Sequence, residues 1–302
     1  MSLLGRFVVA TLPLAPRFLV GRVAARYVAG ETMAEALATV RELNGAGAAA
    51  TLDVLGEEVT DRDKARAAVE EYLRVFAAID EQRLDANVSL KLTLLGLKID
   101  QDFCCDNVER IAAAAAACGN FVRLDMEDAT TTDATLAIYQ RLQPRYGNLG
   151  VVFQAYMRRT LCDIDRLPAE GANVRLCKGI YIEPRTIAWK GYQTVRHNFV
   201  AALEKLITRG VYAAIATHDE YLVCAATALI DRHRLPRERY EFQMLLGVDH
   251  ELRRILLAAG HRLRVYVPYG ADWYAYSVRR LRENPEIARH VVNAFFGRRK
   301  VR

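Results

Sequence analysis

Two adjacent arginines near the end of the chain could bind an acidic group. Arg279 and Arg280 lie in a stretch that is expected to be helical and that Pro285 ends. Tyr276 precedes them by three and four residues and Glu283 follows them by four and three, so the four side chains share one side of the helix. Adjacent guanidinium groups offer paired hydrogen bonds to a carboxylate. The segment is therefore either a carboxylate-binding element or an exposed ladder of ion pairs.

Polar side chains also lie at or near the ends of most apolar runs after residue 48. They are Lys91, Asp125, Glu127, Gln154, Arg175, Lys178, Thr217, His218, Glu241, Gln243 and Tyr266. Burying polar groups costs free energy unless they are paired, so the set as a whole favours a ligand site over packing. Taken singly, Lys91 could be a solvated lysine and His218 a hydrogen-bonded histidine. Asp125 and Glu127 could pair with Arg123 on the same strand face.

Eight apolar runs are predicted to be the strands that position these side chains. They cover residues 49–55, 87–93, 121–127, 149–156, 172–178, 211–217, 240–246 and 263–268. Between them lie longer stretches, such as 61–79, whose apolar spacings of three and four predict helices. Asp61, Asp106, Thr132 and Asp219 are expected in the caps or first turns of such helices. Eight alternations predict an α/β fold, the (β/α)8 TIM-like barrel, with its active site at the carboxyl ends of the strands.

The barrel is expected to be catalytic and to occupy residues 48–302, after N-terminal accessory helices in residues 1–47. One or two helices are predicted in 17–44, and the glycine-containing stretch 44–47 is expected to separate them from the first strand. The helix that carries Arg279 and Arg280 follows the eighth strand. We therefore expect this final helix to lie over the barrel mouth, where a carboxylate could reach it.

The charge of the chain is unevenly placed. The 302 residues are 52% hydrophobic and 26% charged, which is an ordinary globular composition, and the net charge is +6. Eight basic residues lie at the two ends: Arg6, Arg17, Arg22, Arg26, Arg298, Arg299, Lys300 and Arg302. The remaining 34 basic and 36 acidic residues leave the body nearly neutral. This distribution argues against a nucleic-acid groove and favours a small-molecule site. The basic ends are either solubilising tails or weak attachments to anionic lipid.

Membrane, redox and metal signals are weak. The longest apolar run, residues 7–15, is too short to span a bilayer, although with Arg6 before it the run has the outline of a secretory signal. Six cysteines without a CxxC pair, among apolar neighbours, predict reduced, buried thiols in a cytoplasmic protein. The histidines are scattered, which disfavours a metal site, and the chain has no glycine-rich nucleotide-binding loop.

Nine short motifs occur in the same order as in a known family. They are Leu55-Gly-Glu57, Ser89-Leu-Lys91-Leu, Leu124-Asp125-Met-Glu127, Gln154-Ala-Tyr, Arg175-Leu-Cys-Lys178-Gly179-Ile-Tyr181, Ala216-Thr217-His218, Glu241-Phe-Gln243-Met-Leu, Tyr266-Val-Pro and Tyr276-Ser-Val-Arg279-Arg280-Leu-Arg-Glu283. Together they resemble the flavin-dependent proline dehydrogenases, which oxidise L-proline to Δ1-pyrroline-5-carboxylate. The length resembles the compact monofunctional bacterial form of that family.

The resemblance implies a role for each matching residue. Lys91, Arg279 and Arg280 would hold the proline carboxylate, and Tyr266 and Tyr276 would pack against the proline ring. Asp125 and Arg175 match catalytic positions. FAD would be bound by Met126, Gln154, Arg175, Lys178, Gly179, Ile180, Thr217, His218 and Glu283. Glu57 would pair with the first arginine of the final helix and close the site. Ile180 departs from the small alanine that is common in the family.

The resemblance also implies partners. Electrons would pass to a membrane quinone, and a pyrroline-5-carboxylate (glutamate semialdehyde) dehydrogenase would consume the product. The protein would then be cytoplasmic, with at most peripheral contact on the inner face of the membrane. Three other interpretations stay open: a Schiff-base lyase that uses Lys91 or Lys178, a non-catalytic flavin-binding protein at a membrane surface, and a methylenetetrahydrofolate-reductase-like flavin barrel, which Arg279 and Arg280 disfavour.

Replacing either arginine tests the carboxylate assignment. We expect Arg279→Met or Arg280→Met to raise the KM for proline by about tenfold or more, because the carboxylate would lose a charged donor. Steady-state kinetics of both variants measure the effect. An unchanged KM in both would contradict the assignment.

Overall fold

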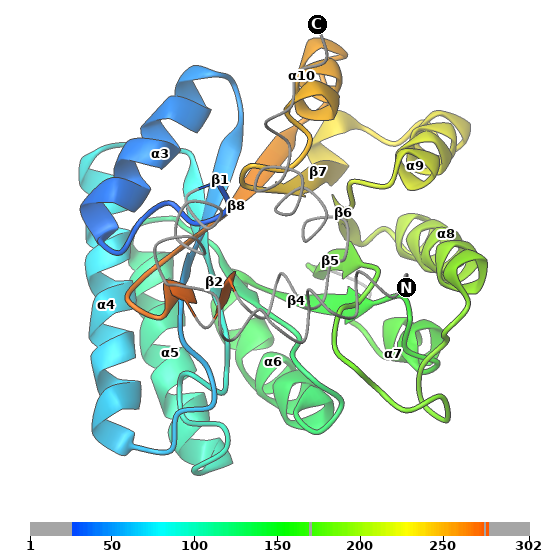
Figure 1. The fold of residues 1–302 in the computed structure, drawn as a ribbon. Coiled ribbons are helices and arrows are strands. Elements are labelled where there is room, and N and C mark those ends of the chain that lie inside the picture. Colours follow the sequence, from blue (N-terminus) through cyan, green and yellow to red (C-terminus); the bar gives the residue numbers. More distant parts are fainter. Residues whose placement is uncertain (1–25, 169–170, 275, 278–302) are drawn as a thin grey trace, which may run out of the picture.

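The computed structural model describes residues 26–168, 171–274, 276 and 277. Its centre is a closed barrel of eight parallel strands in chain order (Figure 1). They are β1 (Ala49–Val54), β2 (Ala86–Leu90), β3 (Val122–Leu124), β4 (Leu149–Gln154), β5 (Asn173–Cys177), β6 (Tyr212–Ala216), β7 (Tyr240–Leu245) and β8 (Leu263–Tyr269). The predicted barrel is confirmed, and the predicted strands lie at the right positions. Most are one to three residues shorter than expected, and Lys91 lies just beyond the end of β2.

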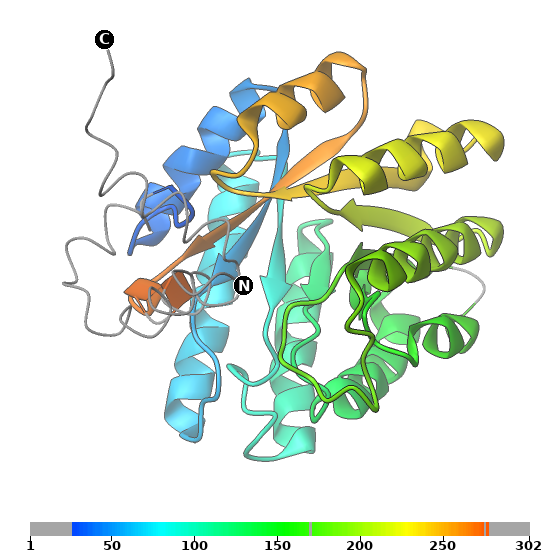
Figure 2. The ribbon, with the colours of Figure 1, turned by 45° about the vertical axis from the view of Figure 1, so that its right-hand side comes forward.

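Helices surround the strands, as Figures 1 and 2 show. They are α3 (Met33–Gly45), α4 (Arg62–Glu81), α5 (Gln101–Ala117), α6 (Thr132–Tyr146), α7 (Thr160–Asp165), α8 (Tyr192–Thr208), α9 (Glu220–Arg232), the short 3-10 helix η2 (Arg237–Arg239) and α10 (His250–Ala258). In the described part of the chain, none of them has the length and hydropathy that a membrane crossing requires.

Three of the four expected capping or first-turn residues lie at the start of a helix. Asp61 caps α4, accepting hydrogen bonds from the backbone N–H groups of residues 63 and 64. Thr132 opens the first turn of α6, and Asp219 occupies the N-cap position of α9. The expectation for Asp106 is wrong, because α5 begins earlier and Asp100 caps it by accepting from the N–H of Phe103 at 2.7 Å.

The helix α3 completes the ring of helices on the side of β1 and β8. A capping box fixes its start: Thr32 accepts from the N–H of Glu35, and the Glu35 carboxylate accepts from the N–H of Thr32 at 2.9 Å. Its buried residues, Ala36, Leu37, Val40 and Leu43, belong to the same core as the strands. This helix confirms part of the prediction for residues 17–44, whereas the stretch 17–25 lies outside the described residues. The division at residue 47 remains a prediction.

The two faces of the barrel wall differ in chemistry. Alternate strand residues such as Leu52, Val88, Leu176 and Phe242 face the helices and form the apolar core. The residues between them face the barrel interior, which in most such barrels is filled by branched apolar side chains. Here the interior holds acidic, basic and amide side chains instead. Polar side chains thus lie deep inside the barrel as well as at the ends of the strands.

The cysteines follow the prediction only in part. All six are free thiols, and Cys104 and Cys105 are buried. Cys162 on α7 and Cys224 on α9 are exposed, so the expectation of six buried thiols is wrong. Apolar neighbours along the chain do not bury a residue when the helix turns it toward solvent.

Candidate active site

A cavity of about 890 Å³ opens at the carboxyl ends of the strands. This volume lies at the upper end of the range of about 300–1,000 Å³ that is typical of ligand and cofactor sites. Twelve of the predicted site residues line it: Lys91, Asp125, Met126, Gln154, Arg175, Lys178, Gly179, Ile180, Thr217, His218, Tyr266 and Tyr276. The fold therefore brings together predicted side chains from six of the eight strands or the loops that follow them.

The remaining predicted residues do not line the described cavity. Glu57 is half-buried in the loop after β1. Arg279, Arg280 and Glu283 lie outside the described residues. A helical segment begins at residue 273, and Tyr276 on it is buried and faces the cavity.

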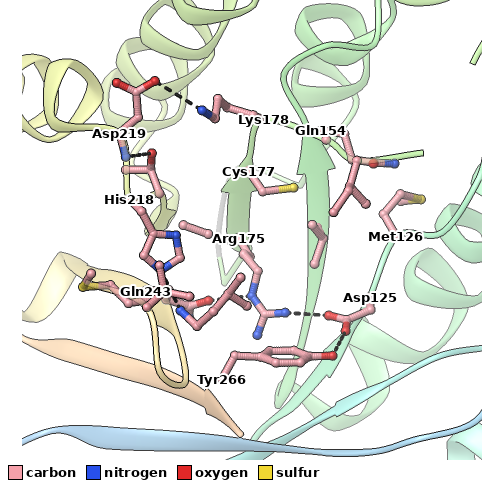
Figure 3. Close-up of a pocket in the computed structure, with 18 of the residues that line it drawn as sticks. Asp125, Met126, Gln154, Arg175, Cys177, Lys178, His218, Asp219, Gln243 and Tyr266 are labelled. Atoms are coloured by element: carbon pink, nitrogen blue, oxygen red, sulfur yellow. Dashed lines mark hydrogen bonds and ion pairs between the residues drawn. The ribbon is translucent and has the colours of Figure 1, made fainter. Parts of the chain in front are cut away.

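Arg175 and Asp125 form an ion pair on the cavity wall. Arg175 Nη1 donates to Asp125 Oδ1 at 2.6 Å, and the Tyr266 hydroxyl donates to Asp125 Oδ2 at 2.9 Å (Figure 3). Burial and the charge of Asp125 raise the pKa of Tyr266 well above its usual value, so the phenol stays a donor. Both carboxylate oxygens of Asp125 are therefore held in fixed directions. The alternative pairing of Asp125 or Glu127 with Arg123 is wrong.

Arg123 and Glu127 have other partners. Arg123 donates to the carbonyl groups of Val151 and Asn173 at 3.1 and 2.7 Å, deeper in the barrel. Glu127 accepts from the N–H and the hydroxyl of Thr93 at 3.0 and 2.5 Å. Residues two apart on a strand share a face but lie at different depths. The side chains of Arg123 on β3 and of Asp125 and Glu127 just after it consequently reach different depths of the interior.

Lys91 forms a second ion pair, with a residue that the sequence analysis missed. Its ammonium donates to Asp53 Oδ2 at 2.6 Å and to the Tyr266 hydroxyl at 3.2 Å. The Asp53 side chain is fully buried. Burial lowers the pKa of Lys91, but the charges of Asp53 and Asp125 outweigh it and raise the pKa. The only sequence signal for Asp53 was a charged residue inside the apolar run 49–55.

A third ion pair is connected to Arg175 through Gln243. Glu241 on β7 accepts from Arg264 Nε on β8 at 3.0 and 3.1 Å, and both side chains are buried. Gln243 connects this pair to Arg175, since Arg175 Nε donates to its amide oxygen at 2.5 Å and its amide nitrogen donates to Glu241 at 2.6 Å. Tyr266 connects the first two pairs in the same way. The three ion pairs thus form one network with equal numbers of acidic and basic groups.

The rim of the cavity carries a separate group of charges. Asp219 accepts from Arg196 Nη2 at 2.6 Å, from Lys178 at 3.2 Å and from the Tyr192 hydroxyl at 3.0 Å. Burial raises the pKa of Asp219, but these donors outweigh burial and lower it to about 2. Arg196 and Tyr192 lie on α8, where no sequence pattern separated them from ordinary surface residues.

The loop after β5 shapes the same rim. Gly179 has φ of +99°, and a Cβ atom there would lie 2.2 Å from the Tyr156 ring. Glycine is the residue that tolerates both the positive φ and this close approach. His218, on the loop after β6, accepts the backbone N–H of Leu245 with Nε2 at 2.9 Å, so a neutral ring carries its proton on Nδ1. Among the described residues, no group of acidic, histidine or cysteine side chains could hold a metal ion.

A family comparison decides what kind of barrel this is. The family model described as proline dehydrogenase matches residues 36–293. The chain belongs to the proline dehydrogenase family. It is 37% identical over 280 residues to proline dehydrogenase 2 of Bacillus subtilis strain 168, covering 92% of this chain and 91% of the relative. It is 36% identical over 274 residues to proline dehydrogenase of Deinococcus radiodurans, covering 89% and 88%.

Larger members of the proline dehydrogenase family contain a similar barrel. The chain is 25% identical to bifunctional protein PutA of Escherichia coli strain K12 over an alignment of 304 positions, gaps included, and the alignment covers 86% of this chain but 23% of that protein. A solved structure of proline utilization A from Bdellovibrio bacteriovorus, inactivated by N-propargylglycine, superposes with a TM-score of 0.82 at 23% identity. The match covers 92% of this chain and 34% of that one. These likenesses support the fold, and the chain spans about a third of the solved structure.

Breaking the Asp53–Lys91 pair should destabilise the protein. We expect Asp53→Ala to lower the free energy of unfolding by about 3–5 kcal/mol, because it leaves a buried ammonium without its counter-ion. Urea denaturation of the FAD-loaded protein measures the change. Asp63→Ala removes an exposed partner of Arg66 and serves as the control, with a far smaller effect. Equal losses in the two variants would contradict the assigned role of the pair.

The Asp219 group should make stability depend on pH. A carboxyl whose pKa is lowered on folding stabilises the native state above its unfolded pKa, and this contribution disappears as the pH falls through the folded pKa. We expect Asp219→Asn to cost about 2 kcal/mol at pH 7. The difference from wild type should shrink between about pH 4 and pH 2. Denaturant unfolding of both proteins at several pH values measures it, and a difference that does not change with pH would refute the account.

Proposed function

We propose that this chain is an FAD-dependent proline dehydrogenase that oxidises L-proline to Δ1-pyrroline-5-carboxylate. The observation that carries the proposal is the cavity itself, in which Lys91, Asp125, Arg175 and Tyr266 meet the predicted FAD-binding residues. Membership of the family and the names of the closely similar relatives support the substrate.

The residues of the cavity fit FAD in size and in donor chemistry. Lys178 and Arg196 supply cationic donors at the rim, as a pyrophosphate requires. Gln154 is oriented by donating to the Glu127 carbonyl at 2.9 Å, and His218 by its bond to Leu245. We propose that these residues hold FAD together with Met126, Gly179, Ile180, Thr217 and, from outside the described residues, Glu283. When bound, the flavin supplies an acceptor for the hydride that leaves C5 of proline.

The protein would recognise the carboxylate of proline with Lys91 and two further cations. An ammonium has three N–H groups, and two of those of Lys91 go to Asp53 and Tyr266, so the third can go to the substrate. The interior network is neutral overall, so it provides no surplus positive charge. We assign that charge to Arg279 and Arg280, which follow the helical residue Tyr276 in the chain. Glu57 would pair with Arg279 and close the site.

Asp125 and Arg175 would act on the reacting end of the substrate. The amine of proline must be neutral before hydride leaves C5, and the cations around the carboxylate favour its neutral form. Arg175 would stabilise the negative charge that builds up on the reduced cofactor. Tyr266, held between Lys91 and Asp125, would pack against the ring. The balanced reaction removes a hydride from C5 and a proton from nitrogen and leaves a carbon–nitrogen double bond.

We further propose that the two electrons pass to a membrane quinone and that a pyrroline-5-carboxylate dehydrogenase consumes the product. The chain matches 23% of the bifunctional Escherichia coli relative, which leaves room there for a second activity. We place the protein in the cytoplasm, with peripheral contact at the inner face of the membrane through the basic ends. No nucleic-acid partner is proposed. The Schiff-base lyase finds less support, because the ammonium of Lys91 is ion-paired and that of Lys178 lies beside Asp219.

Anaerobic reduction by proline tests the proposed function. We expect proline to bleach the absorbance of bound flavin, because the hydride stays on the cofactor when no acceptor is present. Cyclopentane carboxylate lacks the amine and should bind without bleaching. A spectrum that proline leaves unchanged would contradict the dehydrogenase, and a substrate trapped on lysine by borohydride would support the lyase.

A further inference from the structure

Arg175 is fixed by three polar partners that come from three other strands or their ends. Nη1 donates to Asp125, Nη2 donates to the Ser89 hydroxyl at 3.0 Å, and Nε donates to Gln243 at 2.5 Å. Asp125 is the only partner of the three with a charge. Gln243 is the partner whose own hydrogen bonds continue into the barrel.

The contacts of Gln243 lead to the far side of the barrel. Its amide nitrogen donates to Glu241, which accepts from Arg264, and Arg264 Nη1 donates to the carbonyl of Ala50 on β1 at 2.7 Å. The exposed fractions of Gln243, Glu241 and Arg264 are 5%, 3% and 5%. The guanidinium of Arg175 is thereby anchored through buried hydrogen bonds to β7, β8 and β1.

The orientation of the Gln243 amide is dictated by its neighbours. Arg175 Nε can only donate and an ionised Glu241 can only accept, so the amide oxygen must face Arg175 and the amide nitrogen must face Glu241. Burial raises the pKa of Glu241, but the charge of Arg264 outweighs it and lowers the pKa, so Glu241 is ionised. Only a neutral group with one acceptor and one donor satisfies both sides. A carboxylate at this position would be unable to donate to Glu241.

Gln243 also separates two charges. Glu241 is neutralised by Arg264, which donates to both of its oxygens. Because Gln243 carries no charge, Arg175 receives a hydrogen bond partner here without receiving a second negative charge. The positive charge of Arg175 is then offset by Asp125 alone among its three hydrogen-bond partners.

We propose that Gln243, held by Glu241 and Arg264, is a positioning residue that fixes the Arg175 guanidinium and preserves its positive charge toward the cavity. This inference rests on the proposed function, in which that charge stabilises the reduced cofactor. It predicts that the reduction potential of bound flavin depends on residue 243.

The substitution Gln243→Glu tests the charge. It keeps the shape of the side chain but places a carboxylate between Arg175 and Glu241. We expect the midpoint potential of the FAD-loaded protein to become more negative and kcat for proline to fall by about 10- to 100-fold, with a smaller change in KM. Gln143→Glu is the matched control, because Gln143 is about equally buried and, among the described residues, bonds to the backbone groups Gly171 O and Leu149 N. We expect the control to leave the potential unchanged.

The substitution Gln243→Met tests the hydrogen bond without adding charge. We expect kcat to fall while the potential changes less than in Gln243→Glu. Reductive titration with dithionite measures the midpoint potential without proline. It therefore tests the role of Gln243 separately from the proposed function. A wild-type flavin that proline does not bleach would refute the proposed function and leave this test in place. Wild-type potential in Gln243→Glu, or wild-type kcat in Gln243→Met, would overturn the proposal. If Gln243→Glu does not fold, kcat of Gln243→Met decides alone.

Discussion

Charged side chains can occupy the interior of this barrel because ion pairs or hydrogen bonds compensate them there. Desolvating a single charge costs several kcal/mol, and partners with good geometry must offset that cost. The pairs Asp53–Lys91, Asp125–Arg175 and Glu241–Arg264 supply such partners, and Tyr266 and Gln243 join them into one network. Since each member fixes its neighbours, the network replaces the apolar filling of an ordinary barrel and aims its last groups at the cavity.

The need to compensate buried charges also explains how the two faces of the barrel wall are used. The apolar faces of the strands point outward and pack under the helices, so the helices hold the wall while the polar groups hold the inside. The cavity lies at one end of the network, where Lys91 and Arg175 reach solvent-accessible space. The rim group around Asp219 lies apart from the network, on the loops and on α8. In the proposed function, the rim charges would hold the phosphates of the cofactor, and the network would face the substrate and the reacting part of the flavin.

Much of this arrangement could be predicted from the sequence. The spacing and length of the apolar runs predicted the eight strands. Because active sites of such barrels lie at the carboxyl ends of the strands, Lys91, Asp125, Arg175 and Tyr266 were expected together. Pairing could not be predicted, because it depends on depth within the barrel: Arg123 and Asp125 are two residues apart, yet they reach different layers. Asp53 gave only the weak signal of a charge within an apolar run. Arg196 gave none, since a helix surface carries charges for many reasons.

A high-resolution crystal structure of the FAD-loaded protein tests the central claim most directly. The account predicts that Arg175 Nε lies within hydrogen-bond distance of Gln243, that Nη1 contacts Asp125, and that Glu241 contacts both Gln243 and Arg264. An Arg175 side chain turned away from Gln243 and Asp125, with Glu241 and Arg264 separated, would contradict it.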